Sequence, residues 1–149
     1  MTAPVYLDAC IIIDLVEGQP EQQERLAAAL KGRAVIATEL ARLESRIGAL
    51  RQGQAGHLET YRQFFDGCDM LPMDRSVFDI ATDLRVRHGI KTPDALHLAA
   101  ALHSVCGEFW TNDKRLASAA QGRIRIVTWG DLSQATGKAA PEPANQPTA

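Results

Sequence analysis

Short β-prone segments alternate with longer helical segments along most of this chain, and that alternation limits the folds open to it. The β-prone segments are rich in Val, Ile, Phe and Trp, whereas the stretches between them have helical apolar spacing. The predicted strands are 5–7, 34–37, 69–73, 108–111 and 124–129, and the predicted helices are 11–16, 21–31, 39–51, 57–66, 75–88, 93–105 and 114–120. Strands that alternate with helices pair in parallel. The sequence therefore predicts an α/β fold, a parallel β-sheet flanked by α-helices.

The length of 149 residues corresponds to one domain with a single core. From Gly137 onward the chain has no large apolar residue and is rich in Ala, Pro and polar residues. We therefore expect a folded domain over 1–136 and a disordered C-terminal tail over 137–149.

Composition excludes several classes of protein. Hydrophobic residues make up 46% of the chain and charged residues 23%, which are ordinary values for a globular domain. No apolar run approaches the ~18 residues of a membrane span, and no signal peptide is recognisable. The three cysteines are widely spaced and form no Cys-x-x-Cys, so a zinc site and a disulfide framework are both disfavoured. We expect a cytoplasmic protein. Its net charge of −2 does not by itself indicate a nucleic-acid binder.

Helix signals place one acidic residue in an unusual position. Thr38 is a predicted N-cap, and in the helix that follows the spacing of Leu40, Leu43, Ile47 and Leu50 forms one apolar stripe. Glu44 lies at the edge of this stripe, half turned toward the core, where a carboxylate requires a partner or a cavity. Farther along, Thr92 is predicted as an N-cap and Pro93 as the first helical residue.

Three further carboxylates follow the ends of predicted elements. Asp8 comes directly after the first strand, Asp113 follows the fourth, and Asp94 lies in the first turn of a helix. Each alone has an ordinary interpretation as a turn former, a helix cap or a residue favoured by the helix dipole. Because a parallel sheet brings such positions to one edge, we expect them to gather there with Glu44. Gathered carboxylates repel and raise one another's pKa unless a divalent cation lies between them, and oxygen ligands suit Mg²⁺ or Mn²⁺.

Four segments resemble the PIN-domain nucleases, and the VapC-type toxins of bacterial toxin–antitoxin pairs are the most similar group. They are VYLD at 5–8, TELARLE at 38–44, KTPDALHLAAAL at 91–102 and WTNDKRL at 110–116. The resemblance covers about residues 4–132 and implies a single PIN-like domain. It also implies a Mg²⁺-dependent ribonuclease, with Mn²⁺ as a substitute, that is often a homodimer and is neutralised by a small VapB-like antitoxin.

The resemblance assigns a set of site residues. Its acidic quartet, which would hold the metal and carry catalysis, falls on Asp8, Glu44, Asp94 and Asp113. Thr111 and Asn112 match the residues that precede the last acid of the family, and they complete the predicted catalytic set.

One departure from the family pattern follows the first acid. Hydroxyl or amide residues are frequent there, whereas this chain has Ala9 and Cys10, so a hydrogen bond to an acidic ligand is expected to be missing. We interpret Cys10 as a small buried apolar residue rather than a nucleophile. His97 is interpreted as a packed or surface histidine rather than a metal ligand, and Asp14 as a solvated acid.

Several points stay open at this stage. Arg42 and Arg46 could contact phosphates or only solvate their helix. The main alternative function is a catalytically inactive PIN scaffold that binds RNA or a protein partner. A phosphatase that forms an aspartyl-phosphate at Asp8 is disfavoured, because such enzymes require a second Asp where this chain has Cys10.

Overall fold

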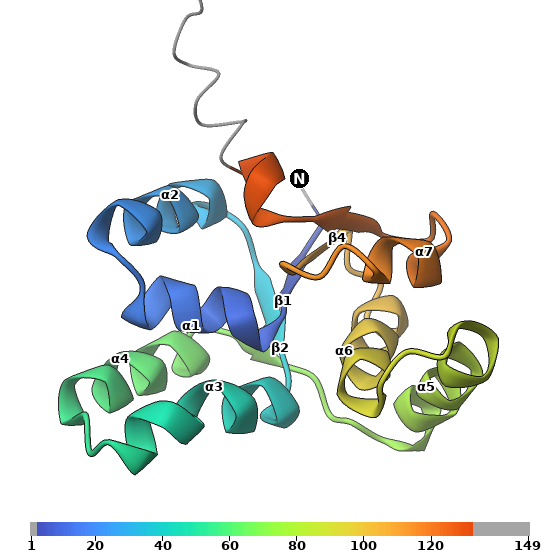
Figure 1. The fold of residues 1–149 in the computed structure, drawn as a ribbon, viewed down its shortest axis with the longest axis horizontal. Helices are drawn as coiled ribbons and strands as arrows, with labels where there is room; N and C mark the ends of the chain where they lie inside the picture. Colours follow the sequence, from blue (N-terminus) through green and yellow to red (C-terminus); the bar gives the residue numbers. More distant parts are fainter. Residues whose placement is uncertain (1–2, 133–149) are drawn as a thin grey trace, which may run out of the picture.

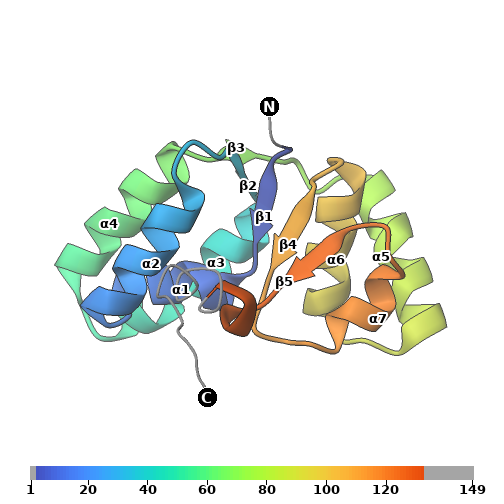
Figure 2. The ribbon, with the colours of Figure 1, turned by 90° about the horizontal axis from the view of Figure 1, so that it is seen from above.

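The computed structural model describes residues 3–132, which form one parallel sheet with helices on both faces (Figure 1 and Figure 2). The strands are β1 (Val5–Leu7), β2 (Val35–Ala37), β3 (Asp69–Met70), β4 (Glu108–Trp110) and β5 (Arg125–Val127). Their order in the sheet is β3-β2-β1-β4-β5, and every pair is parallel. The predicted α/β fold with a parallel sheet is confirmed.

The helices divide between the two faces of the sheet. They are α1 (Ala9–Glu17), α2 (Pro20–Leu30), α3 (Glu39–Arg51), α4 (Ala55–Asp66), α5 (Arg75–His88), α6 (Thr92–His103) and α7 (Leu116–Ala120). The first four pack on one face and the last three on the other (Figure 1). The chain changes faces between β3 and β4, so the strand order reverses beside β1. In open α/β sheets this reversal point is where ligands bind.

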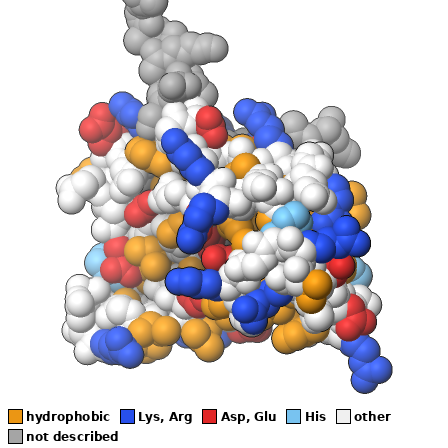
Figure 3. Space-filling view, turned by 45° about the vertical axis from the view of Figure 1, so that its right-hand side comes forward, with side chains coloured by type: hydrophobic (Ala, Val, Ile, Leu, Met, Phe, Trp, Pro, Cys, Tyr) orange, Lys and Arg blue, Asp and Glu red, His pale blue; other side chains and the backbone are white. Residues whose placement is uncertain are grey.

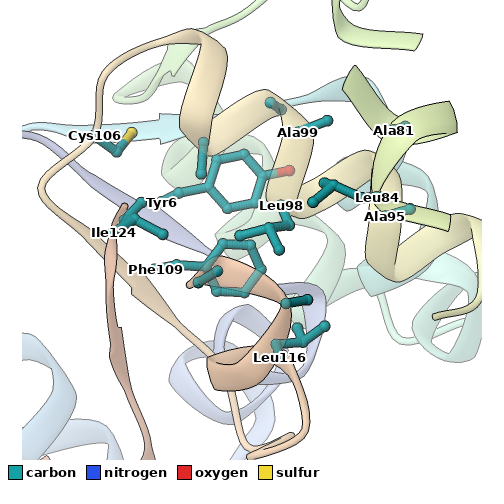
Figure 4. Packing of buried hydrophobic residues seen from close by; sticks show 14 of the residues in the cluster. Tyr6, Ala81, Leu84, Ala95, Leu98, Ala99, Cys106, Phe109, Leu116 and Ile124 are labelled. Atoms are coloured by element: carbon teal, nitrogen blue, oxygen red, sulfur yellow. The ribbon is translucent and has the colours of Figure 1, made fainter. Parts of the chain in front are cut away.

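Alternation along β1 supplies both cores. Val5 and Leu7 face the cluster under α1 to α4, whereas Tyr6 faces the cluster under α5 to α7. The Tyr6 ring stacks on Phe109 of β4, with ring centroids 5.3 Å apart (Figure 4). A central strand buried on both faces explains why β1 is continuously apolar up to Asp8.

Most of the predicted helix boundaries agree with the structure to within a few residues. Thr38 caps α3 by accepting a hydrogen bond from the Ala41 N–H. Gly89 ends α5 at a positive φ of 66°, which glycine adopts without steric cost. The prediction for Thr92 is wrong by one residue, because Lys91 is the N-cap of α6. The Thr92 hydroxyl is instead a hydrogen-bond partner of the Arg85 guanidinium.

The expected core face of α3 is also wrong. Its buried positions are the small residues Ala41, Ser45 and Ala49, whereas Leu43 is 54% exposed and Leu50 is 55% exposed. Small side chains let α3 approach α1 closely, so close helix packing decides the buried face rather than apolar content. Glu44 is half-buried beside that face.

Among residues 3–132, no helix is long and apolar enough to cross a membrane. The predicted tail over 137–149 lies outside the described residues.

Candidate active site

Asp8 lies where the carboxyl ends of β1 and β4 meet. Its backbone N–H donates to the Trp110 carbonyl at 3.0 Å, which extends the pairing of the two strands by one residue. Its carboxylate begins α1 by accepting from the Ala9 N–H at 2.8 Å. The Thr111 hydroxyl, which follows β4, donates to Asp8 Oδ2 at 2.8 Å. Sheet pairing, helix capping and a hydroxyl donor therefore fix the orientation of this carboxylate.

The departure from the family pattern at Cys10 does not leave Asp8 without side-chain donors. The Cys10 thiol lies 3.7 Å from Asp8 Oδ2, a long and weak S–H contact. Burial, together with the negative charge of Asp8, raises the pKa of the Cys10 thiol to about 11. A half-buried, neutral thiol agrees with the interpretation of Cys10 as a small packing residue rather than a nucleophile. The Thr111 hydroxyl provides the stronger hydrogen bond to Asp8.

Glu44 reaches the same place from α3 and meets His97 from α6. The Nε2 atom of His97 lies 2.7 Å from Glu44 Oε1 and 3.8 Å from Asp8 Oδ1. One ligand atom from each of these three residues lies within 4.8 Å of the others, which is compact enough to hold a metal ion. Two carboxylates that are 36 residues apart in sequence are thus brought together across the end of β1. His97 is buried, as expected for a packed residue, but its side chain also contacts the two carboxylates of the site.

A directional chain of hydrogen bonds holds the His97 ring. Its Nδ1 atom lies 2.6 Å from the Tyr6 hydroxyl, which lies 3.0 Å from Thr38 Oγ1. Since an ionised Glu44 can only accept, His97 donates from Nε2, and in its neutral form it then accepts at Nδ1. Tyr6 must then donate to His97 and accept from Thr38, whose oxygen already accepts from the Ala41 N–H. Burial, with the charges of Asp8 and Glu44, raises the pKa of Tyr6 well above its usual value, so this donor proton is retained.

Asp94 contributes a third acidic side chain from the first turn of α6. Burial raises the pKa of Asp94, and the negative charges of Asp8 and Asp113 raise it further. The nearby His97 side chain and the Arg115 guanidinium oppose this shift without cancelling it. Asp94 is therefore close enough to the other acids to sense their charge, as expected for gathered carboxylates.

Asp113 belongs to the same edge but is paired with a cation. Arg115 donates from Nε to Asp113 Oδ1 at 2.9 Å and from Nη2 to Oδ2 at 2.7 Å. The Arg115 side chain lowers the pKa of Asp113. The Asp113 carboxylate also accepts from the Arg115 backbone N–H in the turn before α7, whose N-cap is Arg115, so Asp113 holds this turn and does not cap the helix.

The remaining candidates lie around this cluster. Asn112 is exposed, and its amide is 3.5 Å from an oxygen of Asp14, a half-buried acid whose pKa is raised by burial. Asp14 therefore adjoins Asn112 and is half-buried, so it is not simply a solvated acid. Arg42 pairs with Glu39, and the Arg46 side chain donates to the Arg42 carbonyl. Both arginines line a hollow between α3 and α4 and make no hydrogen bond to the acids described above.

The structure thus brings Asp8 and Glu44 together with His97. Asp94 lies near enough to feel the charges of Asp8 and Asp113, and Asp113 is paired with Arg115. Sequence reasoning missed the part played by Tyr6. The available signal was a tyrosine in the middle of an apolar strand, because a buried phenol needs a hydrogen-bond partner.

The fold and the site together indicate the class of protein. It is an α/β protein whose acidic cluster, a candidate metal site, lies where the strand order of the parallel sheet reverses. Residues 5–122 match the PIN domain family, and the chain belongs to that family.

Relatives and solved structures extend this assignment. The chain is 31% identical over 120 residues to Ribonuclease VapC47 of Mycobacterium tuberculosis, covering 76% of this chain and 88% of that protein. Its fold is similar to a structure of VapBC2 from Rickettsia felis bound to a promoter DNA fragment, with a TM-score of 0.69, 13% identity, and coverage of 84% of this chain and 98% of that one. It is also similar to FitAcB from Neisseria gonorrhoeae, with a TM-score of 0.67, 22% identity, and coverage of 83% and 96%.

Proposed function

We propose that this chain is a metal-dependent endoribonuclease that acts as the toxin of a toxin–antitoxin pair. One observation carries the proposal: Asp8 and Glu44, from different elements, converge with His97 at the carboxyl edge of a PIN-family sheet. The similarity to Ribonuclease VapC47 and to toxin–antitoxin complexes supports both the reaction and the biological role.

The donor set fits a divalent cation that prefers oxygen ligands. Asp8, Glu44, Asp94 and Asp113 would hold Mg²⁺, or Mn²⁺ in its place. The raised pKa of Asp94 supports this assignment, because it results from burial and then from the negative charges of Asp8 and Asp113. When bound, such an ion activates water and stabilises the departing oxygen of a phosphodiester.

The remaining residues orient this set. Thr111 donates to Asp8, and His97 donates to Glu44, so each carboxylate keeps one oxygen directed by a fixed hydrogen bond. Asn112, exposed beside Asp14, would contact the substrate backbone. Arg115 offers a guanidinium next to Asp113, where the charge of a phosphate would need a partner.

The proposal includes partners and a compartment. The substrate is RNA in the cytoplasm, and a VapB-like antitoxin would present an Arg or Lys to the acidic cluster and so neutralise it. We further propose that the chain forms a homodimer.

Cleavage of a labelled single-stranded RNA tests the reaction. We expect Mn²⁺-dependent cleavage by the wild type and its loss in Asp8→Asn and Glu44→Gln. Asp79→Asn, an exposed acid on α5, is the matched control and should cut normally. Equal cleavage by all four proteins would remove the acidic cluster from the reaction. RNA binding without cleavage by the wild type in Mg²⁺ and in Mn²⁺ would favour the inactive scaffold instead.

A further inference from the structure

A cavity of about 430 Å³ opens beside two of the four acids. Asp94 and Asp113 line one part of it, the loop between α5 and α6 lines another, and α7 forms the rest. Asp94 also senses the charge of Asp8, so the cavity adjoins the acidic cluster. Its volume lies in the range of roughly 300–1,000 Å³ that is usual for sites that take small molecules or parts of larger ligands.

The walls of this cavity combine apolar surface with cations. Ile90, Leu116 and Ala119 provide apolar surface, and Ser118 adds an exposed hydroxyl. Lys91 and Arg115 line the cavity and are exposed, and their positive charges act on the nearby acids Asp113 and Asp94. In Figure 3, Lys and Arg side chains gather over the middle of the face shown, with acidic side chains between them.

We propose that this cavity binds one nucleotide of single-stranded RNA next to the cleaved phosphodiester bond, with Lys91 and Arg115 contacting its phosphate. This inference rests on the ribonuclease function proposed above and names where its substrate lies. A splayed base of a single strand can enter such a cavity, whereas a base held in a duplex cannot. The apolar wall suits the face of a base, and a guanidinium plane can stack on it.

Arg115 has two competing partners in this arrangement. In the structure both oxygens of Asp113 are engaged by the Arg115 side chain. A divalent cation held by Asp113 competes for those oxygens and leaves the guanidinium free for a phosphate. Replacing Arg115 by alanine therefore has opposite effects, tighter Mn²⁺ binding and weaker RNA binding.

Binding measurements without cleavage test the cavity. Fluorescence anisotropy of a labelled single-stranded oligonucleotide, with saturating Ca²⁺ in place of Mn²⁺ to occupy the carboxylates, reports RNA affinity for each variant, and a gel of the same samples checks that the oligonucleotide stays intact. We expect Lys91→Ala and Ser118→Trp to weaken binding at least about fivefold, since one lost base or phosphate contact has an effect of this order. Lys91→Ala should also reduce the slope of log affinity against log salt by about 0.7, the value for one lost phosphate contact on a single strand.

Lys114→Ala is the matched control. Lys114 is also exposed, but it lines a different hollow against β5, so its loss should leave the affinity within about twofold of wild type. Lys91, Lys114 and Ser118 all lie at the surface, so their variants should fold, and a thermal melt of each checks this. Mn²⁺ titration of Arg115→Ala by calorimetry gives the second readout.

The outcomes separate this inference from the function on which it rests. If wild type cleaves RNA while Lys91→Ala and Ser118→Trp bind RNA as Lys114→Ala does, the cavity is not a nucleotide site and the proposed function stands. If wild type neither binds nor cleaves RNA, both proposals fail. If the cavity variants lose a co-expressed protein partner but keep RNA affinity, the cavity is a protein contact and the inference is overturned. If Arg115→Ala weakens both Mn²⁺ binding and RNA binding, the result contradicts the competition between the cation and Arg115 for Asp113.

Discussion

The hydroxyl of Tyr6 is the most informative single group to remove. It donates to His97 and accepts from Thr38, and all three side chains are buried. Tyr6→Phe keeps the ring and its stacking on Phe109, but leaves the Nδ1 of His97 without a donor. An unsatisfied buried polar group costs about 1–3 kcal/mol. For a chain of this size each kcal/mol corresponds to about 2–4 °C in Tm, so we expect a fall of about 2–12 °C.

Tyr61→Phe is the matched control for that variant. Tyr61 is equally buried, and its hydroxyl donates to Glu17, away from the acidic cluster. It should therefore lose a comparable amount of stability and retain RNA cleavage. Tyr6→Phe should lose cleavage as well, about tenfold or more in kcat with little change in KM, because side chains that orient metal ligands typically contribute 10–100-fold.

The tautomer of His97 can be measured separately from the stability of the protein. ¹⁵N chemical shifts of the wild-type imidazole should report a proton on Nε2 and none on Nδ1. A proton on Nδ1 of wild-type His97 would refute the hydrogen-bond direction argued above. Full cleavage by Tyr6→Phe, with the same loss of stability as Tyr61→Phe, would reduce Tyr6 to a packing residue.

Three further predictions concern the acids and the biological role. Asp94→Asn should be at least as stable as wild type without metal at pH 7. The raised pKa of Asp94 means that the folded state binds its proton more tightly, so stability falls as pH rises from its unfolded pKa of about 4 through its folded pKa; urea melts of the variant should lack this fall. Thr111→Val should lose about 1.5–3 kcal/mol, because it removes a buried donor to ionised Asp8, and a variant as stable as wild type would contradict this. Expression of the chain alone should slow bacterial growth and co-expression with its genetic neighbour should restore it, whereas equal growth with soluble, active protein would rule out a toxin.

The predictable part of the fold came from local patterns. Each strand and helix has its own apolar spacing and end signals, such as Thr38 before α3 and Gly89 after α5, so the alternation and the parallel sheet could be predicted. The buried face of α3 could not be predicted from such local patterns. Its exposed stripe, which includes Leu43 and Leu50, has the stronger apolar pattern, yet close packing against α1 selects the face with alanine and serine.

The candidate site also has a part that could be predicted from sequence and a part that could not. Asp8 and Asp113 follow strands β1 and β4, and parallel strands end at one edge, so their position at the same edge of the sheet could be expected from sequence. The contact between Tyr6 and His97 joins residues 91 apart, and nothing local predicts it. Likewise, pairing of Arg115 with Asp113 depends on the turn that precedes α7, which sequence assigned to the helix itself.

Titration with Mn²⁺, monitored by thermal unfolding, tests the central claim most directly. A ligand that binds only the folded state adds about 2.7 kcal/mol at a concentration 100 times its Kd. At about 2–4 °C for each kcal/mol, the wild-type Tm should rise by about 5–11 °C. Asp8→Asn, which lacks a carboxylate at the junction of β1 and β4, should show a much smaller rise at the same Mn²⁺ concentration. An equal rise in both proteins, or none in wild type, would contradict a metal site built on Asp8 and Glu44.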